Sequence, residues 1–340
     1  MKLSLAIVWL LLFALCGFAQ TGGVAPPQQQ QSPPKLVRVE GTKVSLVPPP
    51  GFVPSKQFTG YELAATGASI IVLELSGPIA QVAAGFNDPA QLSRKAMQLL
   101  GRETVTLNGA PATLFHLAQT ANGTEYLKWM LALGDANATV LVAANFPRQL
   151  EQQYSRVLRD SILSMRWDQS RKVVVDEGVP FSVEAQGGLK LAQQRLLNTL
   201  LYTVDGIVPA QSVEQPLFVA GMSISQQLIL NPKEFSERRV FATESVVSIG
   251  VVDAQPVMID GLSGYEIVTQ GKDRATGQPV TLYQVTLFDE TIYYVMQGLI
   301  GGRRATDYLG TFRAMARSFK RRATPVQEPP VKRPQRVKRH

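Results

Sequence analysis

Cysteine and histidine are nearly absent from this chain of 340 residues. Cys16 is its single cysteine, and His116 and His340 are its two histidines. If the segment around Cys16 is removed on export, the mature chain has no disulfide, no thiolate metal ligand and no cysteine nucleophile. Because His340 is the last residue, His116 is the one candidate general base or imidazole ligand in a folded domain. The sequence therefore argues against a zinc site, and it predicts neither a metal nor a cofactor.

Phosphate-binding and nucleophile motifs are absent as well. The chain has no G-x-x-x-x-G-K-[ST] loop and no G-x-G-x-x-G run after a predicted strand. Ser263 lies in G-L-S-G-Y, which lacks the G-x-S-x-G spacing and falls on a predicted hairpin, so a turn residue is predicted there. His116 is expected to be a packing residue, because the position 152 residues further along is Val268. A protein that is not an enzyme is the favoured interpretation.

The other polar and aromatic candidates also have a structural interpretation. At Gly301–Arg304, before the last predicted helix, backbone N–H groups could hold an anion, although a solvated arginine pair is favoured. Asp176–Glu177 and Asp289–Glu290 are expected to be solvated acids at turns or linkers. The glycosylation patterns at Asn122 and Asn137 are expected to be unused, since the chain is interpreted as bacterial. Packing is favoured over ligand stacking for five aromatic residues, Tyr126, Trp129, Tyr283, Tyr293 and Tyr294.

Long apolar runs are limited to the first residues of the chain. Lys2 precedes an uncharged run that ends at small residues, which predicts a signal peptide over residues 1–19 with cleavage between Ala19 and Gln20. Lipidation at Cys16 is the alternative, but Leu15 stands where lipoprotein signals usually have a small residue. No later segment approaches the ~20 apolar residues that a membrane-spanning helix needs. The protein is expected to be exported, and to be periplasmic, envelope-associated or secreted.

Positive charge is concentrated at the end of the chain. The net charge is +8, and Lys320–His340 holds eight Lys or Arg and one Glu. Subtracting the seven charges of this segment and the one of Lys2 leaves zero for residues 20–319. This segment is expected to bind an anionic envelope component or an acidic protein, with nucleic acid disfavoured by export; a solvated tail is the alternative. The residues concerned are Lys320, Arg321, Arg322, Lys332, Arg333, Arg336, Lys338 and Arg339.

The rest of the chain contains a repeated pattern of predicted strands. Asn108–Gly109 and Asp260–Gly261 lie 152 residues apart, and each is flanked by alternating apolar residues, as expected of a β-hairpin. Two further turns follow each hairpin. They are predicted at Asn122–Gly123 and Gly134–Asn137 in the first unit and at Lys272–Gly277 and Asp289–Glu290 in the second. Each unit thus predicts a four-stranded antiparallel meander.

Helices are predicted on both sides of each meander. One is expected over Ala90–Leu100, opened by Asp88–Pro89 and closed by Gly101, and another from Pro232, after Asn231, to about Val246. Each unit closes with an amphipathic helix, expected over Leu150–Trp167 and Ala305–Lys320. Their apolar faces are expected to hold Leu150, Tyr154, Val157, Leu158, Ile162 and Met165 in the first, and Tyr308, Leu309, Phe312, Met315, Ala316 and Phe319 in the second.

The predicted fold class is α+β, with two tandem α/β/α sandwich domains that each have a mainly antiparallel sheet flanked by helices. The predicted organisation is a signal peptide at 1–19, a Pro/Gln-rich linker at 20–38, a first domain at 39–168, a linker at 169–178, a second domain at 179–320 and a basic Pro-rich disordered tail at 321–340.

The two units resemble the PsbP-like family. The resemblance rests on Pro50-Gly51-Phe52, the hairpin dipeptides, and the closing Ser164-Met165-Arg166 and Ser318-Phe319-Lys320. It covers residues of about 42–167 and 180–321, although G-G-L-K-L-A-Q-Q-R-L, residues 187–196, replaces Pro-Gly-Phe in the second unit. The resemblance implies exported α/β/α sandwich domains and a non-catalytic role, and it implies no site residue.

Three hypotheses follow for the function. The first is a non-catalytic exported interaction protein whose basic tail attaches it to an anionic surface or an acidic partner. The second is an envelope hydrolase or lipid-modifying enzyme that uses an unidentified carboxylate site. The third is a small-molecule or lipid carrier with a cavity between sheet and helices, which a large apolar pocket would favour.

Overall fold

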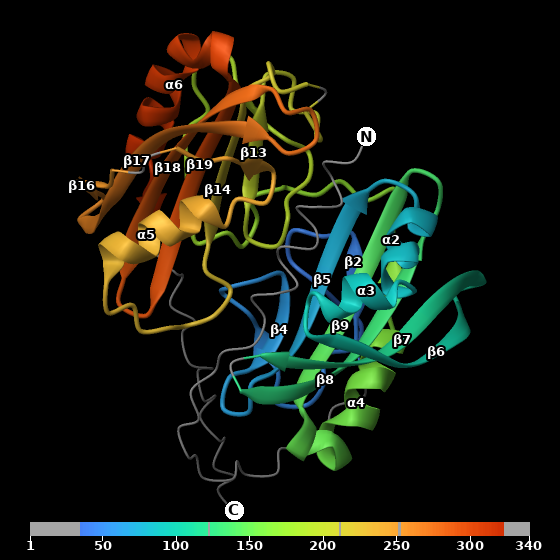
Figure 1. Cartoon of the computed structure of the whole chain (residues 1–340). Coiled ribbons are helices and arrows are strands. Elements are labelled where there is room, and N and C mark those ends of the chain that lie inside the picture. Colours follow the sequence, from blue (N-terminus) through green and yellow to red (C-terminus); the bar gives the residue numbers. More distant parts are fainter. Residues whose placement is uncertain (1–34, 122, 211, 251–252, 323–340) are drawn as a thin grey trace, which may run out of the picture.

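The fold of the chain is α+β, with helices packed against antiparallel sheets (Figure 1). The computed structural model describes residues 35–121, 123–210, 212–250 and 253–322. We call residues 35–168 the first half and residues 179–322 the second half. Ala19, Gln20, Cys16 and Asn122 lie outside the described residues, as do the predicted signal peptide and most of the predicted basic tail.

A seven-stranded antiparallel sheet forms the centre of the first half. Its strand order is β3-β4-β5-β9-β8-β7-β6. Helix α4 (Glu151–Leu163) packs on one face of this sheet, and α2 (Ile79–Phe86) and α3 (Pro89–Ser93) lie on the other. The strands are β3 (Val53–Pro54), β4 (Gly60–Leu63), β5 (Ala68–Ser76), β6 (Met97–Leu107), β7 (Ala110–Ala121), β8 (Thr124–Gly134) and β9 (Ala138–Pro147).

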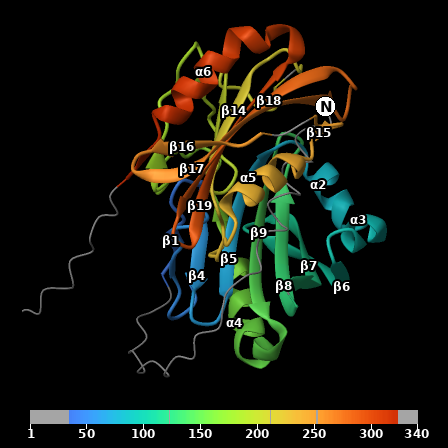
Figure 2. The ribbon, with the colours of Figure 1, turned by 60° about the vertical axis from the view of Figure 1, so that its left-hand side comes forward.

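The second half repeats this strand order. Its sheet runs β12-β13-β14-β19-β18-β17-β15, and β16 also pairs with β17. Helix α6 (Ala305–Arg317) packs on one face and α5 (Pro232–Phe241) on the other. In Figures 1 and 2, α4 and α6 lie at opposite ends of the molecule. The strands are β12 (Lys190–Leu191), β13 (Leu200–Thr203), β14 (Leu217–Met222), β15 (Val246–Val247), β16 (Gln255–Ile259), β17 (Leu262–Asp273), β18 (Pro279–Asp289) and β19 (Ile292–Gly301).

In each half, one small sheet pairs residues near the start of that half with residues near its end. β1 (Val37–Arg38), β2 (Val44–Leu46) and β10 (Arg166–Trp167) form one, and β11 (Phe181–Ser182) pairs with β20 (Lys320–Arg321) in the other. Short 3-10 turns at Arg148–Leu150 and Gly302–Arg304 lead into α4 and α6. The residues just after each closing helix therefore pair with the first residues of the same half.

The predicted hairpins are confirmed. Asn108–Gly109 joins β6 to β7 with φ of 51° and 84°, and Asp260–Gly261 joins β16 to β17 with φ of 53° and 74°. A tight hairpin turn of this kind requires positive φ at both central residues, which Asn, Asp and Gly tolerate. The turns predicted at Gly134–Asn137, Lys272–Gly277 and Asp289–Glu290 are also confirmed.

Several predicted helix ends are wrong. The helix expected over Ala90–Leu100 ends at Ser93, and Met97–Leu107 forms strand β6, with Gly101 beside a β-bulge instead of at a helix cap. The helix expected to reach Val246 ends at Phe241, because Val246 pairs with β17. The two closing helices end at Leu163 and Arg317, and the residues after them form β10 and β20. In each case pairing with a distant strand overrides local helix propensity.

The apolar faces predicted for the closing helices are confirmed. Leu158 and Ile162 of α4 are fully buried against the first sheet, and Phe312 and Met315 of α6 are buried against the second. Gly298 of β19 permits this contact, because a Cβ there would lie 2.3 Å from Cδ2 of Phe312. Burying one large side chain of this kind contributes about 1.5–3 kcal/mol, so these faces position the helices on the sheets.

A third apolar core joins the two halves. Ala192, Leu196, Leu197, Leu201 and Ile224 of the second half are buried in one cluster with residues of the first sheet, α2 and α3. We call these five residues the seam. Thr59 Oγ1 donates to the Leu197 carbonyl at 3.2 Å, and Asn198 Nδ2 donates to the Lys56 carbonyl at 3.0 Å. Apolar packing and hydrogen bonds both therefore connect the halves.

Candidate functional site: the cleft between the two halves

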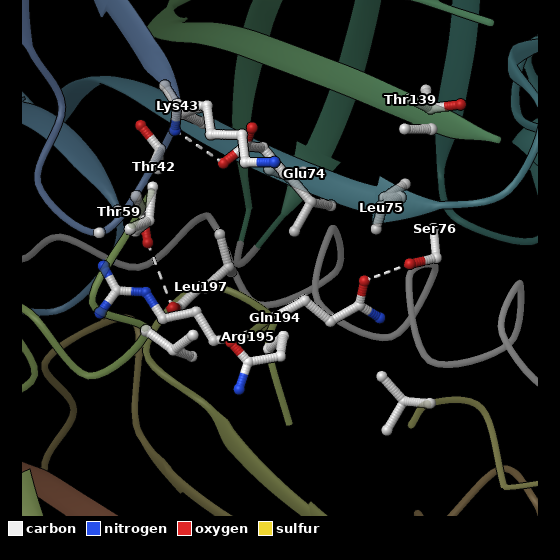
Figure 3. Close-up of a pocket in the computed structure, with 18 of the residues that line it drawn as sticks. Thr42, Lys43, Thr59, Glu74, Leu75, Ser76, Thr139, Gln194, Arg195 and Leu197 are labelled. Atoms are coloured by element: carbon white, nitrogen blue, oxygen red, sulfur yellow. Dashed lines mark hydrogen bonds between the residues drawn. The ribbon is translucent and has the colours of Figure 1, made fainter. Parts of the chain in front are cut away.

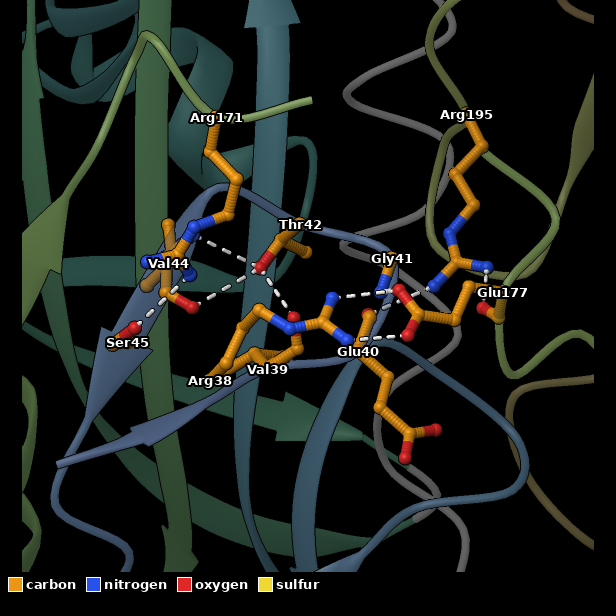
Figure 4. A network of polar contacts seen from close by, with 10 residues as sticks. All are labelled: Arg38, Val39, Glu40, Gly41, Thr42, Val44, Ser45, Arg171, Glu177 and Arg195. Carbon is orange, nitrogen blue, oxygen red and sulfur yellow. Dashed lines mark hydrogen bonds and ion pairs between the residues drawn. The ribbon is translucent and has the colours of Figure 1, made fainter. Parts of the chain in front are cut away.

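A charged cluster connects three segments of the chain beside the seam (Figure 4). Arg38 pairs with the Glu177 carboxylate through both terminal nitrogens, with Nη1 at 2.6 Å from Oε2. The Gly41 N–H donates to the same Oε2 at 3.1 Å. Arg195 Nη1 donates to the Glu177 carbonyl at 2.6 Å and Nη2 to the Glu40 carbonyl at 3.1 Å. We call Arg38, Glu177 and Arg195 the clamp.

Glycine at position 41 allows this approach. Gly41 has φ of 69°, and a Cβ there would lie 2.1 Å from Arg195 Nη2. A side chain would meet both the backbone strain and the guanidinium. Arg195, a residue that is 8% exposed, therefore lies directly against the backbone of the first half.

Burial and ion pairing shift the pKa values of the clamp. Burial lowers the pKa of Arg195 to about 10, and the acids Glu177, Asp176, Glu40 and Glu74 offset part of that effect. Arg195 therefore stays protonated at neutral pH. The hydrogen bond from Arg38 is the largest cause that lowers the pKa of the Glu177 carboxyl, with further lowering from the Gly41 N–H and both arginines. The clamp thus favours the ionised form of Glu177.

Acid is expected to weaken the clamp. Because the folded pKa of Glu177 lies below its unfolded value, its contribution to stability is present above the unfolded pKa and is lost as pH falls through the folded pKa. A Glu177→Gln variant should therefore lose stability near neutral pH and show a weaker dependence of unfolding free energy on pH below about 4.5. Urea unfolding at pH 7 and at successively lower pH measures both. If the parent and the variant have the same slope against pH, Glu177 does not link pH to stability.

A cleft of about 400 Å³ with a mixed polar and apolar lining lies next to the clamp, between the two halves (Figure 3). Glu74 of β5 accepts from the Lys43 N–H at 3.0 Å and from Trp167 Nε1 at 2.8 Å. On the other wall, Gln194 is hydrogen-bonded to Ser76, and Arg195 and Leu197 come from the second half. The lining therefore includes the Glu74 carboxylate, the Arg195 guanidinium and Lys43, together with several hydroxyl and amide groups and apolar side chains.

The charged groups of Glu74 and Arg195 in this cleft form hydrogen bonds with the protein itself. Within the part of the chain that the structure describes, no group of three or more His, Cys, Asp or Glu is arranged to hold a metal ion. Both Glu74 oxygens have donors from the protein, and both Nη atoms of Arg195 donate to carbonyls. Arg195 Nε is buried without an acceptor among the described residues.

His116 lies in a ring stack on the first sheet. Its ring is 4.0 Å from that of Trp129, at an interplanar angle of 13°. Trp129 Nε1 donates to Ser155 Oγ of α4 at 3.0 Å. Burial lowers the pKa of His116, and its Nε2 has no partner among the described residues. This arrangement agrees with the predicted packing role, and it lies outside the cleft.

Three of the four acids predicted to be solvated have specific partners, whereas Glu290 is exposed as predicted. Glu177 belongs to the clamp, and Asp176 Oδ2 pairs with Arg322 Nη2 at 2.5 Å. Asp289 Oδ2 pairs with Arg321 Nη1 at 3.2 Å. The prediction failed for these three acids because their basic partners come from segments far away in the sequence, which local turn patterns do not reveal.

The remaining candidates are surface or packing residues. Ser263 is the second residue of β17 and exposed, so it lies just after the turn. Arg303 pairs with Glu214 at 3.3 Å, and Arg304 pairs with Asp307 at 3.3 Å, so both arginine charges are already matched. Of the five aromatic residues predicted to pack, Tyr126, Tyr283 and Tyr294 are buried, and Trp129 and Tyr293 are partly exposed.

The eight basic residues assigned to the tail fall into two groups. Lys320 and Arg321 form β20 and pair with Asp260 at 3.5 and 3.1 Å, while Arg322 pairs with Asp176. These three residues are therefore part of the folded body. The other five lie outside the described residues: Lys332, Arg333, Arg336, Lys338 and Arg339.

Several solved structures have weak similarity to the chain. No family model and no curated protein matches the chain. Among solved structures, the immunity protein TplEi of the type VI secretion system from Pseudomonas aeruginosa has 13% identity and a TM-score of 0.32, over 84% of this chain and 97% of that one. LpqN, involved in cell envelope biogenesis of Mycobacterium tuberculosis, has 11% identity and a TM-score of 0.31, over 41% of this chain and 81% of that one.

A PsbP protein is also among the similar structures. The cyanobacterial PsbP from Synechocystis has 9% identity and a TM-score of 0.25, over 42% of this chain and 93% of that one. At these TM-scores the similarities carry no argument about function, and membership of the PsbP-like family remains a prediction. Among the described residues, no helix is long and apolar enough to cross a membrane.

Proposed function

We propose that the protein is an exported, non-catalytic interaction protein. In this proposal the two PsbP-like halves act as one body joined by the seam and the clamp. The basic residues after Arg322 attach that body to an anionic component of the cell envelope. The body then presents the cleft between its halves to a partner.

The distribution of basic charge supports this proposal. Lys320–Arg322 pair with Asp176, Asp260 and Asp289 of the folded body, so the proposal assigns the attachment to the residues after them. The segment after them, residues 323–340, holds five Lys or Arg and Glu328, a net charge of +4. Subtracting this and the charge of Lys2 from +8 leaves +3 for residues 20–322, a segment about seventeen times longer. Charge density thus rises sharply after the folded body.

The size of the effect is sufficient for reversible attachment. A basic residue close to an anionic membrane contributes about 1 kcal/mol, so five contribute roughly 5 kcal/mol at low salt. Salt weakens such binding because exposed charges are screened within about 10 Å at 0.1 M ionic strength. In an exported protein these basic residues are expected to bind lipid headgroups, lipopolysaccharide or wall polymers. Nucleic acid is disfavoured as a partner because an exported chain leaves the compartment that contains it.

Cell fractionation tests the proposal. Three chains are compared: the full chain, a chain that ends at Arg322, and a full-length chain with the five distal basic residues changed to Gln. Ending at Arg322 keeps β20 intact, which ending at Phe319 would not. We expect the full chain to sediment with the envelope and to be released by high salt, and the other two chains to stay soluble.

Two outcomes of this experiment would contradict the proposal. If all three chains are soluble, the distal basic residues do not attach the protein to the envelope, and the proposal fails. If all three remain in the membrane fraction at high salt, a Cys16→Ser variant is added. Release of that variant would assign the attachment to lipidation, and the electrostatic proposal would again fail.

A further inference from the structure

One face of the second sheet is only partly covered. In β14 and β19, Phe218 and Met296 are fully buried beneath α6, whereas Val219 and Val295 on the opposite face are only partly buried. Helix α5 covers that opposite face over β17 and β18, where Val240, Ile267 and Leu282 form a small buried cluster. Between α5 and the seam a cavity of about 230 Å³ remains. We call it the α5 cavity, and its apolar lining includes Leu217, Val219, Val295 and Leu299.

The first half closes the corresponding surface. Its strands β5 and β9 occupy the places of β14 and β19 in the strand order. Ile71, Leu73, Leu141 and Ala143 on the equivalent face are 3–5% exposed, beneath α2 and the seam. These equivalent positions are therefore buried in the first half and only partly covered in the second. Covering the apolar strip of the second half would gain about 25 cal/mol for each Å² removed from water.

A cationic group lies at the wall of the α5 cavity. Arg239, in the last turn of α5, has its guanidinium carbon 6.0 Å from the centre of the Tyr293 ring. Its Nε is buried and has no hydrogen-bond acceptor among the described residues. The next residue back, Arg238, is exposed and pairs with Glu234. Of these two neighbouring arginines, only Arg239 lines the cavity, and within the described residues it has no ion pair.

The rest of the cavity wall is polar but nearly neutral. Hydroxyls of Thr199, Ser223 and Thr243 line it, and Gln297 Nε2 donates to Thr243 Oγ1 at 3.1 Å. Glu244 is its one carboxylate. Burial lowers the pKa of Lys95 from the first half, and the charge of Glu244 offsets part of that effect. The Arg239 guanidinium is the one basic group of this lining, and an anionic oxygen is the strongest hydrogen-bond partner of a charged donor.

We infer that the α5 cavity binds an amphiphile with a single alkyl chain and an anionic headgroup. The alkyl chain would lie on Val219, Val295 and Leu299, and a carboxylate or phosphate oxygen would accept from Arg239. The volume lies below the ~300 Å³ at which most ligand pockets begin, which limits the cavity to one chain. This inference goes beyond electrostatic attachment, because it concerns the folded body and not the basic residues after Arg322.

Isothermal titration calorimetry of the full chain tests the inference. The probes are decanoate, decyl phosphate and the neutral decanol. The variants are Arg239→Gln, its matched control Arg238→Gln, and two cavity-filling variants, Val295→Phe and Val219→Phe. Thermal unfolding identifies which variants fold as the parent does, and two filling variants keep the test decisive if one does not fold.

We expect saturable one-to-one binding of at least one anionic probe. Arg239→Gln should weaken that binding about tenfold or more, in line with the loss of a hydrogen bond to a charged group, and should leave decanol unchanged. Arg238→Gln should change neither, and a folded cavity-filling variant should bind none of the probes. The tighter of the two anionic probes then distinguishes a fatty-acid source from a phosphate headgroup.

Three results would overturn the inference. They are no saturable binding of either anionic probe, equal weakening by Arg238→Gln and Arg239→Gln, and unchanged binding by a folded cavity-filling variant. A chain that ends at Arg322 should keep the affinity of the full chain. Failure of the α5 cavity is therefore distinguishable from failure of the proposed attachment.

Discussion

Replacing Leu201 with aspartate is expected to uncouple the two halves of the protein. Leu201 is 3% exposed, and it belongs to the seam, where residues of both halves form one buried cluster. Removing a buried leucine side chain costs about 2–5 kcal/mol. The carboxylate adds a desolvation penalty, because the described side chains of that cluster are apolar. We expect the parent to unfold in one transition and Leu201→Asp to unfold in two, the first at least ~3 kcal/mol less stable.

Calorimetry and urea unfolding measure this result, and Leu228→Asp is the matched control. Leu228 lies in the second half and is 76% exposed. A substitution at such a site changes stability by only about 0.5 kcal/mol. If Leu201→Asp unfolds in a single transition with the stability of Leu228→Asp, the seam does not join the halves.

The second large effect is expected at Arg195. The Arg195→Leu variant would leave the carbonyls of Glu177 and Glu40 without their donor and would remove a positive charge from beside the Glu177 carboxylate. Leaving a buried hydrogen-bond acceptor without its donor costs about 1–3 kcal/mol, and Arg195 serves two acceptors. We therefore expect a loss of about 3 kcal/mol in unfolding free energy at pH 7.

Arg38→Leu is the control for Arg195→Leu. Arg38 and Glu177 have side chains 36% and 31% exposed, so their ion pair is screened by solvent. Such a pair contributes at most about 1 kcal/mol. Equal losses in the two variants, or a more stable Arg195→Leu protein, would show that Arg195 is not the group that holds the clamp.

Local signals in the sequence predicted the hairpins and the buried helix faces. Asn108–Gly109 and Asp260–Gly261 determine their own turns, because they tolerate positive φ. The apolar spacing of α4 and α6 likewise determines which side packs on the sheet. The strands that follow Leu163 and Arg317 were not predictable, because β10 and β20 form only through pairing with β2 and β11.

The clamp and the seam could not be predicted for the same reason. Arg38, Glu177 and Arg195 lie in three separate segments, and each alone resembles a solvated surface charge. Residues 187–196 depart from the PsbP-like pattern in the sequence, and they include Arg195 and Leu196. That departure is the sequence feature that could have indicated a contact between the halves, since Arg195 and Leu196 contact the first half.

The measurement that tests the proposed function most directly is sedimentation of the purified full chain with anionic lipid vesicles. Chains with and without the residues after Arg322 are compared at about 0.01 M and about 1 M salt, where the screening length falls from roughly 30 to 3 Å. If the basic residues after Arg322 attach the protein, the full chain sediments at low salt and is released at high salt, while the shorter chain stays in solution throughout. Equal sedimentation of the two chains at low salt would contradict this prediction.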